Sequence, residues 1–160
     1  MGLISKTSVM SMSRIVFASG LLLSVLTGCK SATVNEAAVC PQDRYTDLAP
    51  APIASIGNPL EVNQDNLDAG RRLFEKDVSP VPCIDCHGRK GDGNGRMANM
   101  FEPSPRNFTC SQTMDDIPDG QLYWVIRNGS IGTSMPAFEK LDDEEIWLLA
   151  MYIRQFSHSE

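Results

Sequence analysis

The chain has 160 residues, and its 14 Lys plus Arg stand against 20 Asp plus Glu, a formal net charge of −6 at pH 7. A chain of this length holds one small domain with one core rather than two. The acidic balance argues against nucleic acid as a partner, because a surface that binds phosphates is basic.

The first 28 residues have the pattern of a secretory signal peptide. Lys6 and Arg14 supply positive charge, an apolar run covers 15–26, and small residues follow. The run is too short to span a bilayer as a helix. Removal of 1–28 leaves 12 basic and 20 acidic residues, a net charge of −8.

The signal peptide ends in Leu26-Thr27-Gly28-Cys29, which resembles the lipobox of bacterial lipoproteins. The resemblance implies that the thiol of Cys29 carries a diacylglycerol and that the mature protein stays on a membrane, facing the periplasm. Lys30, where inner-membrane lipoproteins carry aspartate, favours the outer membrane. The alternative is an ordinary secreted protein cut nearby, in which Cys29 is discarded or free.

Residues 29–61 are predicted to be a lipidated N-terminus and a proline-rich tether ahead of a domain at 62–160. From 30 to about 66 the chain is poor in large apolar residues and keeps neither helical nor strand periodicity. Its prolines are Pro41, Pro50, Pro52 and Pro59.

Two helices are predicted in the domain before its C-terminal part. The first covers about 66–75, where Gly70 lowers helix stability and therefore indicates a close approach to another element. The second covers about 119–128, after Pro118, and ends at Gly129, a residue suited to a left-handed conformation.

The last helix has the clearest signals. Asp142 can cap it, Glu145 lies three residues on, and a broad apolar face runs to Phe156. The stretch 88–117 is rich in Gly, Pro, Asn and Asp, and no segment alternates like a strand. We expect a mostly α fold of three to four short helices and long loops, whose small core a large apolar prosthetic group would complete.

The prosthetic group is indicated by Cys83-Ile84-Asp85-Cys86-His87, the C-x-x-C-H pattern of covalent haem attachment. Two thiols add across the two vinyl groups of one porphyrin, and the adjacent histidine then lies under the iron. A dithiol redox pair would need a strand and helix context that is absent, and a structural zinc site needs four ligands. The sequence therefore predicts one covalent haem c.

The second axial ligand must approach the iron from the opposite face. Met135 precedes Pro136, which stiffens the backbone and disfavours a helix through Met135. From this context alone Met135 is either a ligand or a core residue. The other candidates are Met97, Met100, Met114 and His158.

Together these features resemble a class I cytochrome c over residues 62–157. The resemblance is carried by Gly70-x-x-x-Phe74, then C-x-x-C-H-G, then Gly-x-x-Met-Pro, then an aromatic-bearing C-terminal helix. It implies the class I fold, with His87 and Met135 as the iron ligands. It also implies that Gly70 and Phe74 of the first helix lie against Leu149 and Tyr152 of the last.

Residues 103–109 resemble the Pro-Arg-Asp-Phe stretch of bacterial monohaem and membrane-complex cytochromes, with Asn107 in place of the aspartate. The resemblance implies a loop beside the haem edge whose carbonyls fix the proximal imidazole, so Pro105 and Arg106 are candidates for that role. A solvent-exposed Arg106 is the alternative. Arg127, Trp124 and Tyr123 are candidates for bonding the haem propionates, or serve packing and solubility.

Cys40 and Cys110 remain after the lipid and the haem take the other three cysteines. In an oxidising compartment a disulfide between them is the favoured expectation. The alternatives are two unpaired thiols, or Cys40 linking two proteins.

A histidine and methionine pair fills both axial positions of the iron and leaves none for a substrate. We therefore predict an electron carrier rather than an enzyme: a membrane-anchored monohaem cytochrome in a periplasmic respiratory chain, between a redox-protein donor and acceptor. The alternative is a permanent cytochrome subunit of a membrane respiratory complex, such as alternative complex III or an oxidase or reductase. An enzyme or ligand sensor would need a labile or absent Met135 bond.

Overall fold

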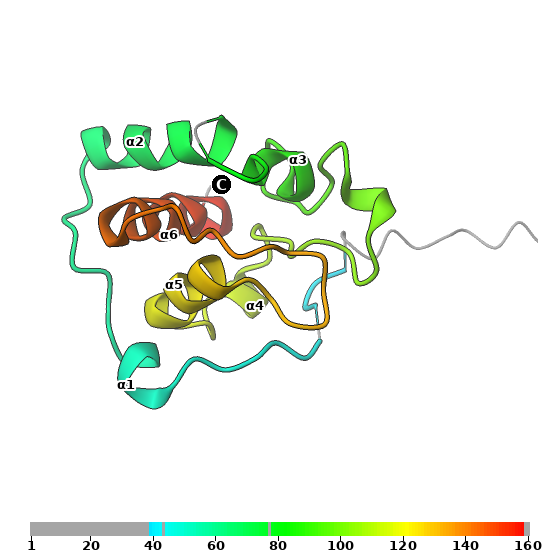
Figure 1. Cartoon of the computed structure of the whole chain (residues 1–160), viewed down its shortest axis with the longest axis horizontal. Coiled ribbons are helices and arrows are strands. Elements are labelled where there is room, and N and C mark those ends of the chain that lie inside the picture. Colours follow the sequence, from blue (N-terminus) through cyan, green and yellow to red (C-terminus); the bar gives the residue numbers. More distant parts are fainter. Residues whose placement is uncertain (1–38, 43, 77, 159–160) are drawn as a thin grey trace, which may run out of the picture. The chain divides into compact units, whose positions relative to one another are not determined.

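The computed structural model describes residues 39–42, 44–76 and 78–158 (Figure 1). The chain divides into two units, Met1–Ala32 and Thr33–Glu160, and every described residue belongs to the second. The signal peptide and Cys29 lie outside the described residues, so cleavage and lipidation stay predictions.

Every regular element in these described ranges is a helix, which confirms the mostly α fold. The elements are α1 (Ala51–Ala54), α2 (Gln64–Glu75), α3 (Cys83–His87), the 3₁₀ turn η2 (Ala98–Met100), α4 (Ser111–Met114), α5 (Asp119–Asn128) and α6 (Asp143–His158). Long loops join them (Figure 1). Within the described part of the chain, no helix combines the length and apolar character needed to cross a membrane.

The three long helices form where their end signals place them. Helix α2 begins two residues before the predicted 66, because the side chain of Asn63 accepts a hydrogen bond from Asn66 N at 2.9 Å and caps it. Helix α5 has the predicted bounds, and Gly129 follows it with a φ of +76°. At the start of α6, Asp142 and Glu145 each accept the other's backbone N–H, at 2.8 and 2.9 Å, in a capping box.

Helices α2 and α6 lie side by side (Figure 1), and Gly70 of α2 is at their contact. A Cβ at Gly70 would stand 2.3 Å from the carbonyl oxygen of Leu148 and 2.8 Å from Cβ of Tyr152, so a glycine is required there. Phe74 meets Tyr152 edge to face, with ring centroids 5.5 Å apart. Tyr152 is thus the partner that the family resemblance implied, whereas Leu148 rather than Leu149 makes the closest approach to Gly70.

The core lies mainly on α6. Ile146 and Leu149 are fully buried there, and Phe74 of α2 and Met114 of α4 are buried to the same degree. Each such side chain contributes about 1.5–3 kcal/mol relative to exposure. Arg154 ties the neighbouring elements to α6, since its guanidinium pairs with Asp119 at 2.8 Å and donates to the carbonyls of Met114 and Ile117.

Residues 39–42 and 44–61, named here the N-terminal strap, lie on the domain, and they fall within the range that we predicted to be a proline-rich tether. Ala49 N donates to Oε1 of the buried Gln121 at 2.7 Å, and Gln121 Nε2 donates to Asp47 O at 2.8 Å. Helix α1 packs on α5, where a Cβ at Gly120 would stand 1.9 Å from Ile53 O. The strap binds through polar contacts between residues far apart in sequence, which leave no periodic pattern.

The Gly70 crossing is tested by Gly70→Ala. The added methyl group has no room between α2 and α6, so we expect the free energy of unfolding to fall by about 1–3 kcal/mol in urea denaturation, in spite of alanine's better helix propensity. Gly57→Ala is the matched control, because nothing lies within 4 Å of its Cβ position. The control should change stability by less than about 0.5 kcal/mol. Equal effects of the two substitutions would contradict the close contact.

Candidate haem-binding site

A cavity of about 880 Å³ lies between α3, the loop over 101–108, α5, the loop over 130–138 and the N-terminal strap. Its size falls in the range of cofactor sites, and its lining is mostly apolar. The sequence-predicted residues that line it are Cys83, Cys86, His87, Pro105, Arg106 and Met135.

Helix α3 carries both motif cysteines and His87 on five residues, after Pro82. The loop that follows returns over the end of this helix and satisfies its carbonyls. Gly95 N donates to Cys86 O at 3.0 Å, and Gly93 N donates to His87 O at 2.9 Å. A Cβ at Gly95 would stand 2.3 Å from Asp85 O, so the loop can lie this close only with glycine at that position.

Arg96, which the sequence analysis did not identify, braces the motif from outside. Its guanidinium donates to both carboxylate oxygens of Asp85, at 2.7 and 2.6 Å. These hydrogen bonds from Arg96 lower the pKa of Asp85, so the carboxylate stays ionised. Nothing in the local pattern pairs residues 85 and 96, because the contact depends on the path of the intervening loop.

The two motif thiols do not have the environment of a redox-active pair. Cys83 and Cys86 are not joined in a disulfide. Burial raises the pKa of the Cys83 thiol to about 12 and raises that of Cys86 as well. Dithiol enzymes need a lowered thiol pKa. The chemistry therefore disfavours the dithiol alternative, and both sulfurs remain available for thioether bonds.

The ring of His87 is held by a hydrogen bond and by a stacked aromatic ring. Its Nδ1 lies 3.0 Å from Arg106 O, and its ring stacks on Phe108 with centroids 4.3 Å apart. A carbonyl oxygen only accepts, so Nδ1 carries the proton and Nε2 keeps its lone pair. Burial lowers the pKa of His87 to about 4, against the opposing effect of the hydrogen bond to Arg106. The imidazole is therefore neutral, the form that binds metals.

Met135 is presented by a tight loop that closes on itself. Ser130 N donates to Met135 O at 3.2 Å, and Met135 N donates to Thr133 Oγ1 at 3.1 Å. A Cβ at Gly129 would stand 2.8 Å from Met135 O, so the positive φ of Gly129 and its lack of a side chain both serve this loop.

Position separates Met135 from the other methionines of the described ranges. Met135 lines the cavity, and the others do not. Met114 is fully buried in the core, and Met100 is 69 % exposed. The location of Met135 supports the prediction that it is an iron ligand rather than a core residue.

The remaining polar candidates lie off the cavity wall. Arg127, which we expected at the propionates, donates to Leu141 O and pairs with Asp143 at 2.6 Å, so it joins α5 to the start of α6. Tyr123 donates to the same carboxylate at 2.6 Å. Trp124 and His158 are also absent from the lining, and His158 lies 4.0 Å from Asp115.

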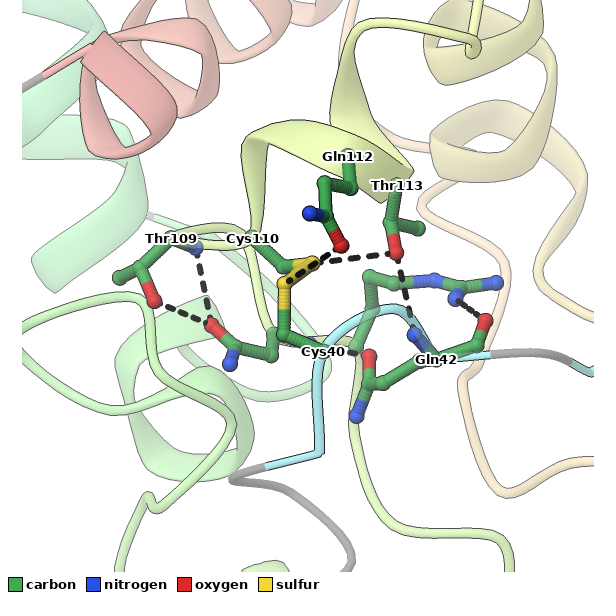
Figure 2. The surroundings of a disulfide bond; sticks show 8 residues. Cys40, Gln42, Thr109, Cys110, Gln112 and Thr113 are labelled. Atoms are coloured by element: carbon green, nitrogen blue, oxygen red, sulfur yellow. Dashed lines mark hydrogen bonds between the residues drawn. A yellow bond between two sulfur atoms is a disulfide. The ribbon is translucent and has the colours of Figure 1, made fainter.

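Cys40 and Cys110 form an intramolecular disulfide with Cα atoms 5.6 Å apart. Figure 2 shows the bond between the strap and the residues that begin α4. Cys110 is buried, and its sulfur lies 3.3 Å from Thr113 Oγ1. The disulfide attaches the start of the described strap to the domain 70 residues further along the chain.

The residues present fit haem c. Two thiols three residues apart, an imidazole with a free Nε2, and a thioether all line the same largely apolar cavity. The set matches the donor chemistry of a covalently attached haem with two protein ligands.

Comparisons with known proteins agree with this geometry. Residues 65–153 match the family model described as cytochrome c oxidase, cbb3-type, subunit III. A chain of the reducing HAO-like protein complex of Kuenenia stuttgartiensis superposes with a TM-score of 0.54 at 28 % sequence identity. The match covers 61 % of this chain and 46 % of that one, so this chain spans less than half of its length. No curated protein matches the sequence.

Proposed function

The chain belongs to the family of cytochrome c oxidase, cbb3-type, subunit III, and we propose that it is a membrane-anchored monohaem carrier that passes single electrons in a periplasmic respiratory chain. It is a class I c-type cytochrome with covalently bound haem c, and its domain is one for electron transfer. The observation that carries the proposal is the presence of His87 and Met135 on the wall of one apolar cavity.

Each residue of the motif has a proposed role. Cys83 and Cys86 would form the thioether bonds, and His87 Nε2 and the sulfur of Met135 would bind the iron. When bound, haem c supplies an iron that takes up and releases one electron, and a thioether ligand raises its reduction potential. If both residues bind the iron, they would leave no position on it for a substrate, which supports a carrier rather than an enzyme.

The surroundings of the ligands suit transfer of an electron without rearrangement. His87 is fixed by a carbonyl on one side and by the ring of Phe108 on the other. Met135 lies in a loop whose backbone groups bond to one another. Holding the His87 ring and the Met135 backbone in this way would limit movement of the two ligands when the charge of the site changes.

The ligand assignment is tested by Met135→Ala. We expect loss of the ferric iron-to-thioether charge-transfer band, new binding of carbon monoxide to the ferrous form, and a lower reduction potential, because methionine ligation raises it. Met100→Ala is the matched control, since Met100 is largely exposed and does not line the cavity. Retention of the band in Met135→Ala would exclude Met135 as the ligand, and carbon monoxide binding by the wild type would exclude the closed-site carrier.

The proposed anchoring through Cys29 is supported by the lipobox-like end of the signal peptide. It would put the domain in the cell envelope, and Lys30 favours the outer membrane. Cells grown on labelled palmitate should incorporate label into the wild-type protein and into Ser31→Ala, which changes a residue outside the lipobox. Cys29→Ala should carry no label, because the acylated thiol is gone. Label in Cys29→Ala would show that lipid is attached elsewhere or not by this route.

Permanent membership of a respiratory complex, such as alternative complex III or an oxidase or reductase, is the second candidate. Two similarities favour it: the family that the chain matches is named after an oxidase subunit, and the similar solved chain belongs to a protein complex. For a carrier we expect the protein to separate from its donor and acceptor after gentle detergent extraction and affinity capture. Capture of a quinol-oxidising or oxidase complex in constant ratio would favour the subunit instead.

A further inference from the structure

The N-terminal strap contacts the loop that carries Arg106 through several hydrogen bonds. The side chain of Arg106 donates to Gln42 O at 2.9 Å and to Thr46 Oγ1 at 3.2 Å. Arg44 donates to Ser104 O. All of these strap residues precede residue 65, where the family match begins.

Gln42 makes the contact that matters most for the site. Its Oε1 accepts from Asn107 N at 2.7 Å, and the carbonyl of the same peptide unit, Arg106 O, lies 3.0 Å from His87 Nδ1. The peptide between Arg106 and Asn107 is planar, so a bond to its N–H also fixes the direction of its C=O. Gln42, this peptide and His87 therefore form one continuous chain of hydrogen bonds.

Two further contacts hold Gln42 in place. Gln42 N donates to Thr113 Oγ1 at 3.1 Å, and the Cys40–Cys110 disulfide lies two residues away. Figure 2 shows Cys40, Gln42 and Thr113 gathered at this bond. The loop side is equally constrained, because Phe108 N donates to Gly91 O at 2.6 Å and Asn107 Oδ1 accepts from Thr109 N at 2.9 Å.

We propose that Gln42 is a positioning residue for the proximal ligand, which orients and polarises His87 through the Arg106–Asn107 peptide and so lowers the reduction potential of the haem. The proposal rests on the proposed role of His87 as iron ligand. Hydrogen bonds in a chain strengthen one another. A stronger acceptor at Nδ1 makes the imidazole a better electron donor, and this favours the ferric state.

The test uses the full-length, haem-loaded protein with Gln42→Met, which keeps the length of the side chain and removes the acceptor. Two quantities are measured: the hydrogen-exchange rate of His87 Nδ1–H in the ferrous protein by proton NMR, and the reduction potential by spectroelectrochemistry. We expect exchange to accelerate about fivefold, as for loss of one ordinary hydrogen bond, and the potential to rise. Gln64→Met makes the same chemical change on α2, away from the cavity lining, and should alter neither.

Gln42→Glu keeps a side-chain acceptor for Asn107 N and should return the exchange rate close to that of the wild type. If Gln42→Met does not fold, Gln42→Leu removes the same acceptor with a shorter side chain and should move both quantities in the same direction. Unchanged exchange and potential in a folded Gln42→Met with an intact methionine-ligand band would overturn the proposal and leave the haem site standing. If the wild type shows neither the ferric iron-to-thioether charge-transfer band nor a His87 signal shifted by the haem, the proposed function is wrong, and this proposal fails with it.

Discussion

A histidine that binds a metal usually donates a hydrogen bond from its other ring nitrogen, which fixes the orientation of the ring. In this domain the acceptor for His87 is the backbone carbonyl of Arg106. That bond sets the tautomer of His87 and the plane of its ring. It also makes the path of the loop over 101–108 critical, because the carbonyl must arrive at the right distance. Phe108 beside the ring, Gly91 behind the loop and the strap outside it all constrain that path.

The three long helices and the haem motif could be read from the sequence because their signals are local. Asp142 and Glu145 mark the start of α6, and Pro118 and Gly129 flank α5, so each signal lies within a few residues of its helix. The C-x-x-C-H pattern specifies its own chemistry by spacing. Gly70 also indicated that its helix packs closely against another, since a glycine within a helix lowers stability and is retained where a contact requires it.

Other parts depend on the tertiary path of the chain and left no local signal. The bonds from Gln121 to residues 47 and 49 join segments more than 70 residues apart, and no periodicity records them. Arg96 reaches Asp85 only because a glycine-rich loop turns back over α3. Arg127 has a charged side chain that could bond a haem propionate, yet it donates to the carboxylate of Asp143 and to the carbonyl of Leu141 where α5 meets α6. Residue type alone could not distinguish these uses.

The disulfide between Cys40 and Cys110 also bears on how such a protein is made. The chain joins one pair of sulfurs across 70 residues, while the sulfurs of Cys83 and Cys86, only three positions apart, are not joined to each other. Random oxidation of the unfolded chain favours the short ring, because closing a loop costs more entropy as the loop lengthens. During maturation a disulfide between Cys83 and Cys86 must therefore be prevented or reversed. Cells that oxidise new thiols quickly but supply haem slowly should accumulate haem-free protein with this disulfide.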